Sequence, residues 1–252
     1  MNLGLNKKVA IVTGGAQGIG KEISAQLAAE GVKIVVVDIN QDILDKTCVE
    51  FEKNGFTVIG LKCDVSREDE VAAVFEQAKR VFDSVDIVVN NAGLGGWAAP
   101  IQDATAESWK KVFDVNMLGV FLFGKYAFRY MIPQGGGVVL SIGSFAGKRG
   151  TLFGDNIAYS SSKAGVIGFT KALSIEGCRH NIRTVCICPG VVNTEILKFH
   201  SEEKRAVLNT MVPMGHMAEP IEIARVVAFF CSDMASHITG EVVDVNGGLF
   251  TD

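Results

Sequence analysis

The amino-acid sequence predicts a single α/β domain with a doubly wound parallel sheet, a Rossmann-like fold. Apolar runs of strand length, such as residues 9–12, 33–38 and 86–90, alternate with segments of helical periodicity along the chain. Strands that alternate with helices form a parallel sheet covered by helices on both faces. The first strand leads into a glycine-rich turn, Thr13-Gly-Gly-Ala-Gln-Gly-Ile-Gly20, of the kind found in sheets that bind dinucleotides.

Length, composition and charge limit the classes of function. With 252 residues, of which 48% are hydrophobic and 21% charged, the chain fits one globular domain over residues 1–252. The net charge of −4 and the lack of a basic block argue against nucleic acid as a partner. No apolar run approaches the roughly 18 residues of a membrane span, and no secretory signal precedes the first strand. We therefore expect a cytoplasmic protein that binds no membrane.

Cysteines and histidines show no spacing typical of a metal site. The six cysteines form no C-x-x-C pair, and the four histidines form no H-E-x-x-H pattern. We therefore expect no catalytic metal. Cys186 and Cys188 alternate within a strand-like run, so both sulfurs should lie on one face of the sheet as packed core thiols.

The first half of the chain carries the strands and helices that begin the sheet. The pair Asn54-Gly55 is a typical helix end. Ser66 and Asp69 resemble a capping box for the next helix. The strands are expected at residues 9–12, 33–38, 57–61 and 86–90, and helices are expected after the glycine turn, at 41–53 and from about 66 to 82.

The second half is expected to contain a long helix, from Thr105 to about Met131, which Gly135-Gly-Gly137 ends. Residues 191–219 are polar, carry three methionines and are expected to form a mobile cover over the substrate. The remaining strands are expected at 138–143, 183–188 and 241–245, and the remaining helices at 158–177 and 220–231.

The glycine turn predicts a pyrophosphate site. Glycine permits positive φ and a close approach of the ligand, and the helix behind it offers free N–H groups and the positive end of a dipole. The spacing Gly14-x-x-x-Gly18-x-Gly20 differs from G-x-G-x-x-G, and an ordinary tight turn explains it equally well on its own. Asp38 follows Gly20 by 38 − 20 = 18 residues, where an acidic residue binds the adenosine ribose hydroxyls. The alternative is that Asp38 caps the following helix.

Tyr159-Ser-Ser-Ser-Lys163 is a second pattern with chemical meaning. Residues four apart share one helix face. The phenol of a free tyrosine has a pKa near ~10, and a nearby ammonium lowers that pKa because it favours the phenolate. The pattern therefore indicates an acid/base group, and its alternative is a plain surface pair.

Taken together, the motifs resemble the classical short-chain dehydrogenase/reductase family over essentially the whole chain. The motifs that carry the resemblance are, in order along the chain, the glycine turn, Asn90-Asn-Ala-Gly93, Ser144, Tyr159-x-x-x-Lys163 and Pro189-Gly190. The resemblance implies hydride transfer between a nicotinamide cofactor and an alcohol or ketone. Ser144 is preferred over Ser141 because Ser141 lies inside an apolar strand.

The resemblance also implies a role for each catalytic position. Tyr159 is the expected general acid/base. Lys163 lowers its pKa and holds the nicotinamide ribose. Ser144 donates a hydrogen bond to the substrate oxygen, and Asn116 supports a proton relay through water to Lys163.

The resemblance implies NAD as the cofactor and a set of residues that bind it. The Asp38 carboxylate would repel a 2′-phosphate, and Gln17 and Ile39 are uncharged where NADP-binding relatives usually place a basic residue. Asp64 and Val65 look like the adenine contact. The expected cofactor contacts are Gly14, Gln17, Gly18, Ile19, Gly20, Asp38, Ile39, Asp64, Val65, Asn90, Gly93, Tyr159, Lys163, Pro189, Gly190, Val192 and Thr194.

The substrate remains open among secondary alcohols, polyols, hydroxysteroids and 3-oxoacyl thioesters. Its pocket is expected to be lined by residues 94–97, Phe145, residues 151–156, Val191 and the cover. Residues 148–156 form a loop longer than is usual in the family. The resemblance implies a homotetramer with helices 105–131 and 158–177 at its interfaces. Two other classes of protein are considered, namely a methyltransferase and a catalytically weak protein that senses NAD(H).

Overall fold

A parallel sheet of seven strands forms the centre of the computed structural model, which describes residues 3–95, 99–152, 156–195 and 202–251. The strand order is β3-β2-β1-β4-β5-β6-β7, and every neighbouring pair is parallel. The strands are β1 Val9–Thr13, β2 Lys33–Asp38, β3 Val58–Lys62, β4 Ile87–Asn90, β5 Gly137–Ile142, β6 Ile182–Pro189 and β7 Val242–Val245. The predicted fold class is therefore confirmed, and most strand bounds differ from the expected ones by a residue or two.

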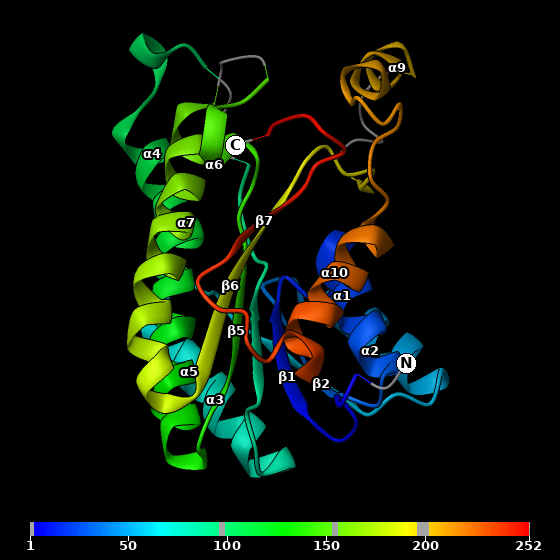
Figure 1. Cartoon of the computed structure of the whole chain (residues 1–252), viewed down its shortest axis with the longest axis vertical. Helices are drawn as coiled ribbons and strands as arrows, with labels where there is room; N and C mark the ends of the chain where they lie inside the picture. Colours follow the sequence, from blue (N-terminus) through cyan, green and yellow to red (C-terminus); the bar gives the residue numbers. More distant parts are fainter. Residues whose placement is uncertain (1–2, 96–98, 153–155, 196–201, 252) are drawn as a thin grey trace.

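Helices cover both faces of the sheet (Figure 1). The α-helices are α1 Gly18–Ala29, α2 Gln41–Lys53, α3 Glu68–Phe82, α4 Ala106–Phe113, α5 Gly119–Gln134, α6 Ala146–Arg149, α7 Ile157–Gly177, α9 Glu202–Met211 and α10 Pro220–Cys231. Helices α1, α2 and α10 pack on one face, and α3, α5 and α7 pack on the other. Among the described helices, none combines the length and the hydropathy needed to span a bilayer.

The alternation of side chains along the strands places apolar core residues on both faces of the sheet. In β1, Ala10 and Val12 belong to the core under α1 and α10, whereas Val9 and Ile11 belong to the core under α3 and α5. Successive side chains of a strand point to opposite faces, and both faces are covered here. Central strands of this sheet are therefore apolar throughout, as the sequence shows.

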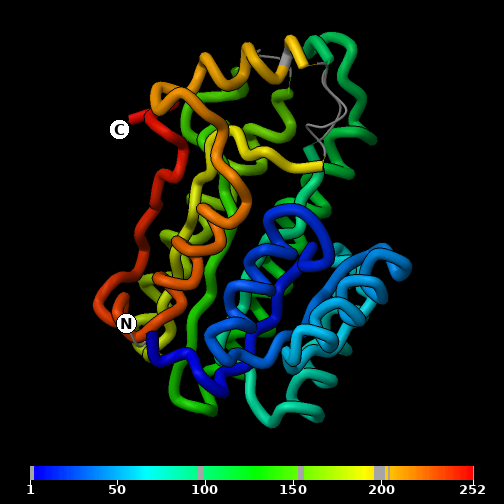
Figure 2. The backbone as a smooth tube through the Cα atoms, turned by 90° about the vertical axis from the view of Figure 1, so that its right-hand side faces the viewer, coloured from blue at the N-terminus to red at the C-terminus, as the bar shows by residue number. Residues whose placement is uncertain are grey.

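The strand order reverses between β1 and β4, and this reversal determines where a ligand binds. From β1 the chain proceeds outwards through β2 to β3, and it then returns to place β4 on the other side of β1. The connections that follow β1 and β4 therefore run in opposite directions, and they leave a crevice at the carboxyl ends of these strands. The N-terminus lies away from this crevice: Figure 2 shows it beside the segment before β7, where Asp233 donates its N–H to the Leu3 carbonyl at 3.1 Å.

The expected long helix is interrupted, which corrects one prediction. A π-helical turn, η2 Asp114–Leu118, joins α4 to α5, and α5 continues to Gln134 before Gly135 ends it with φ +91°. A π turn inserts one extra residue into the helix and is common at functional sites. Hydrophobic periodicity does not reveal such an insertion, because the apolar faces on either side of it still fit helical spacing.

The expected capping box at Ser66 and Asp69 is wrong. Helix α3 begins at Glu68, and Arg67 precedes it without a side-chain cap. Ser66 donates both its backbone N–H, at 3.0 Å, and its hydroxyl, at 2.7 Å, to Asp64 Oδ1. The Asp64 carboxylate therefore binds the Ser66 hydroxyl, and this hydroxyl does not cap the helix. The helix end predicted at Asn54-Gly55 is confirmed, with Gly55 at φ +80°.

The segment predicted as a cover stands at the carboxyl end of the sheet, with α9 above the start of α10 (Figure 1). It is tied at its base, because Asn193 N–H donates to the Ala218 carbonyl at 2.8 Å and Ala218 N–H donates to the Val191 carbonyl at 3.0 Å. Residues 196–201 lie outside the described residues. The mobility of the segment stays a prediction.

Candidate functional site

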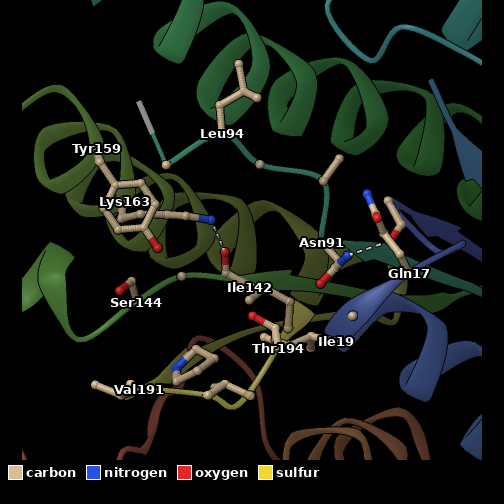
Figure 3. A pocket seen from close by; sticks show the side chains of 18 of the residues that line it. Gln17, Ile19, Asn91, Leu94, Ile142, Ser144, Tyr159, Lys163, Val191 and Thr194 are labelled. Atoms are coloured by element: carbon tan, nitrogen blue, oxygen red, sulfur yellow. Dashed lines mark hydrogen bonds between the residues drawn. The ribbon is translucent and has the colours of Figure 1, made fainter. Parts of the chain in front are cut away.

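A cavity of about 430 Å³ opens at the carboxyl ends of the central strands, where the reversal of strand order predicts a ligand. It brings together the glycine turn, the segment after β4, the end of β5, helix α7 and the loop after β6. Figure 3 shows Ser144, Tyr159 and Lys163 on one side and Gln17, Ile19 and Asn91 on the other. The lining residues are Gly14, Gln17–Ile19, Asn91–Gly95, Ile142–Ser144, Tyr159, Lys163, Pro189–Val192, Thr194 and Glu195.

The glycine turn has the backbone that a pyrophosphate site requires. Gly14 and Gly18 have φ of +59° and +54°, a region that favours glycine. A Cβ on Gly20 would overlap the Gly14 carbonyl oxygen, so only glycine lets the start of α1 pack on the turn. The N-terminus of α1 therefore opens towards the cavity with free N–H groups, and these residues fit the diphosphate of a dinucleotide.

Asn91, which the sequence analysis passed over, holds this turn in place. Its Nδ2 donates to the carbonyl oxygens of Thr13, at 2.9 Å, and Gly14, at 3.1 Å. Thr13 Oγ1 in return accepts the backbone N–H groups of Asn91 and Ala92, both at 3.0 Å. Asn90, the residue expected to contact the cofactor, is buried and donates to Ser141 Oγ at 3.3 Å. The described lining contains Asn91 and not Asn90.

Tyr159 and Lys163 lie one turn apart on α7 and face the same cavity. The Lys163 ammonium lies 5.9 Å from the centroid of the Tyr159 ring, and it donates to the Ile142 carbonyl at 2.7 Å. Lys163 is only 5% exposed. The alternative of a plain surface pair is therefore wrong.

Ser144 reaches the cavity from the end of β5, whereas Ser141 does not line it. The Ser144 hydroxyl accepts the Ala146 N–H at 3.1 Å, and its proximity to Tyr159 lowers the pKa of that phenol. Ser141 is buried in the strand and accepts from Asn90. The arrangement thus places a phenol, an ammonium and a serine hydroxyl around one point where an alcohol or carbonyl oxygen fits.

Burial dominates the electrostatics of these groups. Burial lowers the pKa of Lys163 from its ordinary value to about 8. Burial also raises the pKa of Tyr159, against a lowering effect of the nearby Ser144 hydroxyl. The net shift of the tyrosine is opposite to the expected one, because desolvation of the phenolate outweighs the favourable contacts that the protein's own groups supply.

Asn116 lies in the π turn and is fully enclosed. Its Nδ2 donates to the Leu94 carbonyl at 3.0 Å and to Ser162 Oγ at 2.9 Å, and its Oδ1 accepts the Leu94 N–H at 2.8 Å. The side chain therefore holds the segment after β4 against α7. A Cβ placed on Gly93 would lie 3.4 Å from Asn116 Oδ1 and 3.5 Å from Lys163 Nζ, so both polar groups approach one small space.

The residues expected at the adenosine end lie around the carboxyl ends of β2 and β3. Asp38 ends β2, and its Oδ1 accepts the Asn40 N–H at 3.1 Å. Asn40, not Asp38, caps α2, so the alternative of a helix cap is wrong. Ile39 is 62% exposed. Six of the expected cofactor contacts are outside the described lining of the cavity, and their role stays a prediction: Gly20, Asp38, Ile39, Asp64, Val65 and Asn90.

The substrate side is described in part. Leu94, Gly95 and Val191 line the cavity as expected, together with Thr194 from the cover. Asn156, expected in the pocket lining, instead caps α7 by accepting the Tyr159 N–H at 3.3 Å and donates to the Gly95 carbonyl. The expected wall and cover residues Trp97, Phe153, Asp155, Leu197, Phe199 and His200 lie outside the described residues.

Cys186 and Cys188 point to one face as predicted, with their sulfurs 4.0 Å apart and both side chains buried. Across the described ranges, no group of three or more histidine, cysteine, aspartate or glutamate side chains converges on a point.

Known proteins resemble this chain over nearly its full length. A family model described as enoyl-(acyl carrier protein) reductase matches residues 14–250. The 3-oxoacyl-(acyl-carrier-protein) reductase of Aquifex aeolicus is 34% identical over 99% of this chain and 100% of its own. The cis-4-hydroxycyclohexanecarboxylate dehydrogenase of Sinomonas cyclohexanicum is 32% identical over 96% of both chains.

Solved structures show the same likeness. The structure of a 7α-hydroxysteroid dehydrogenase in complex with NADH and 7-oxoglycochenodeoxycholic acid superposes with a TM-score of 0.92. Its sequence is 33% identical, and the alignment covers 98% of this chain and 96% of that one.

Proposed function

Because the chain belongs to the classical short-chain dehydrogenase/reductase family, we propose that it transfers a hydride between NAD(H) and a secondary alcohol or ketone. The observation that carries the proposal is the convergence of Ser144, Tyr159 and Lys163 on one cavity that also contains the glycine turn. The nicotinamide, when bound, supplies the site that accepts or gives the hydride.

The residues of this chain handle the proton and the substrate oxygen. In alcohol oxidation, the Tyr159 phenolate takes the hydroxyl proton while the carbon loses its hydride. In ketone reduction, the phenol returns that proton to the oxygen. The Ser144 hydroxyl orients the substrate oxygen against Tyr159. The Lys163 ammonium stabilises the phenolate and holds the nicotinamide ribose, and Asn116 connects Lys163 to water.

NAD(H) is the cofactor that the charges at the adenosine end favour. The Asp38 carboxylate would repel a 2′-phosphate, because that phosphate carries about two negative charges. The adjacent exposed side chain is Ile39, which is uncharged. The 7α-hydroxysteroid dehydrogenase structure holds NADH. These observations support NAD(H) over NADP(H).

Replacing Asp38 with asparagine is expected to relax this choice. The amide oxygen still accepts the Asn40 N–H, so the variant removes only the charge. The ratio of the Kd of NADPH to that of NADH should fall roughly tenfold or more, because loss of one repulsive contact of about 1.4 kcal/mol changes affinity tenfold. Fluorescence titration measures both constants. Asp42→Asn, an exposed change in the first turn of α2, is the control; an unchanged ratio in the Asp38 variant would contradict the assignment.

The substrate we propose is a secondary alcohol or ketone with an apolar body, since Leu94, Ile142 and Val191 contribute to the cavity. The test is a panel of polyols, hydroxysteroids, small secondary alcohols and a 3-hydroxyacyl thioester, assayed by nicotinamide absorbance with NAD and NADP in parallel. Turnover of one class with NAD supports the proposal. NADH binding without turnover of any class would favour a protein that senses NAD(H).

A homotetramer is part of the same proposal. Large apolar side chains are exposed on the helices expected at the tetramer interfaces. Trp109 is 38% exposed, Phe121 is 45% exposed and Ile175 is 71% exposed. Monomeric proteins rarely leave large contiguous apolar surface in water. Light scattering coupled to gel filtration should give about four times the chain mass of 26.9 kDa; a monomer at micromolar concentration would contradict this.

A further inference from the structure

The short helix that follows Ser144 is fastened to the last strand by an ion pair. Lys148 Nζ in α6 lies 2.6 Å from Asp244 Oδ2 in β7, and the two side chains are only 9% and 20% exposed. Asp244 stands opposite Cys188 in the pairing of β6 with β7. The contact therefore crosses over β6, and it joins the helix that follows Ser144 to the far edge of the sheet.

The C-terminal tail adds contacts to the same helix, and the C-terminus lies beside α6 (Figure 1). Arg149 Nη1 donates to the Leu249 carbonyl at 3.3 Å, and the Lys148 ammonium lies 5.8 Å from the centroid of the Phe250 ring. Asn246 Nδ2 donates to the Phe250 carbonyl at 2.9 Å, which keeps the tail folded back. Two successive residues of α6 are thus held by β7 and by the tail.

Ser144 is linked to α6 through the backbone. Its hydroxyl accepts the Ala146 N–H at 3.1 Å, and its carbonyl accepts the Gly147 N–H at 3.0 Å. Gly147 packs directly on the backbone of Lys163 in α7, where a Cβ would lie 2.7 Å from the Lys163 carbonyl carbon. Helix α6 has only four residues and no side-chain cap at its start. The orientation of the Ser144 hydroxyl therefore depends on what holds the end of this helix.

We propose that Lys148 and Asp244 are positioning residues for the reaction, and that their ion pair, with the C-terminal tail, holds α6 so that the Ser144 hydroxyl faces Tyr159. The inference rests on the proposed function, because it assigns the pair a part in that chemistry. It adds residues outside the cavity, since neither Lys148 nor Asp244 belongs to its described lining.

Loss of the Lys148–Asp244 ion pair should change the pH dependence of activity, which general instability of the fold would not do. When α6 relaxes, the Ser144 hydroxyl moves away from the Tyr159 phenol. The nearby hydroxyl lowers the pKa of Tyr159, so its displacement raises that pKa. In alcohol oxidation the phenolate is the base, so activity increases with pH, and the midpoint of this increase should move to higher pH.

The experiment compares Lys148→Met with the wild type in alcohol oxidation. We expect kcat to fall about tenfold or more, which corresponds to misplacement of one catalytic group, with the Kd of NADH changed less than about twofold and the pH midpoint raised. Lys148→Arg, which retains the charge, should recover most of the activity. Lys125→Met is the matched control, because Lys125 also pairs at 2.6 Å, with Glu68, but the two side chains are 47% and 52% exposed.

A double variant separates positioning from stability. Lys148→Met combined with Asp244→Leu leaves no unpaired buried charge, so its melting temperature should return towards that of the wild type. A low kcat with a raised midpoint in this variant supports the proposal, whereas recovery of both to wild-type values overturns it. A chain ending at Gly248 keeps the ion pair but lacks the contacts of Leu249 and Phe250. Its pH midpoint for alcohol oxidation should also rise, but by less than in Lys148→Met.

A titration of Tyr159 tests the inference without turnover. The chain has three tyrosines, so the tyrosinate absorbance of the wild type minus that of Tyr159→Phe, both with NAD bound, isolates this phenol. A higher pKa in the Lys148→Met background supports the positioning role, and an unchanged pKa overturns it. A wild type that oxidises no alcohol overturns the proposed function alone, so failure of one claim is distinguishable from failure of the other.

Discussion

Replacing Tyr159 with phenylalanine is expected to lower kcat by roughly 100- to 10,000-fold, the usual contribution of a positioned acid/base group, while NADH still binds. The substitution removes only the phenol oxygen. The ring remains on α7, and its contact with the Lys163 ammonium, 5.9 Å from the ring centroid, is retained. The hydride can still be presented to the substrate carbon, but no protein group then takes or returns the proton.

Fluorescence titration of NADH and single-turnover kinetics separate binding from chemistry in this variant. Tyr126→Phe is the control, because Tyr126 lies on α5, away from the cavity, and its hydroxyl makes only a long 3.5 Å contact with Glu68 Oε1. Near-normal turnover of Tyr159→Phe would exclude this tyrosine as the acid/base group. Loss of NADH binding together with kcat would instead indicate a damaged fold.

Replacing Lys163 with methionine is expected to change the pH dependence of stability as well as catalysis. The pKa of Lys163 is about 8 in the folded protein, below its ordinary value of 10.5. Below the folded pKa, both states carry the proton, and folding must desolvate an ammonium. Between pH 8 and 10.5 only the unfolded chain keeps the proton, so the free energy of unfolding increases with pH.

The wild type should therefore gain stability relative to Lys163→Met across this pH range, by about 3 kcal/mol in total, since one pKa unit corresponds to about 1.4 kcal/mol. Urea unfolding at several pH values measures the difference. Lys171→Met, an exposed change on the same helix, should show no such trend. A constant difference between wild type and Lys163→Met would mean that the buried amine has an ordinary pKa.

Catalysis should fail in Lys163→Met for a separate reason. Methionine fills similar volume but donates no hydrogen bond to Ile142 and offers no charge to the phenolate. We expect kcat to fall by roughly 100-fold or more and the affinity for NADH to decrease, because the ammonium also holds the nicotinamide ribose. A variant that binds NADH as tightly as the wild type would place the ribose contact elsewhere.

The strands and most helices could be predicted because each depends on local pattern. Residues 34–37, within the strand 33–38, are apolar on both faces, as in a central parallel strand that buries both faces. Asn54-Gly55 ends α2 where a left-handed residue is required. The pair Tyr159 and Lys163 shares a helix face by spacing alone.

Features that depend on distant partners were missed. Asn91 holds the glycine turn through contacts with Thr13 and Gly14, more than seventy residues away in sequence. The π turn positions Asn116 so that its side chain forms hydrogen bonds with Leu94 and Ser162. None of these partners is marked by a local pattern.

The sequence by itself determined the order of strands and helices along the chain, the glycine turn and the placement of Tyr159 and Lys163 on one helix face, because these follow from residue type and short-range spacing. Only the tertiary structure decided how far Tyr159 and Lys163 are removed from water, which shifts both pKa values. It also decided that Lys148 and Asp244, 96 residues apart, meet behind Ser144. Burial and long-range contact are properties of the assembled layers, and no single segment of the chain encodes them.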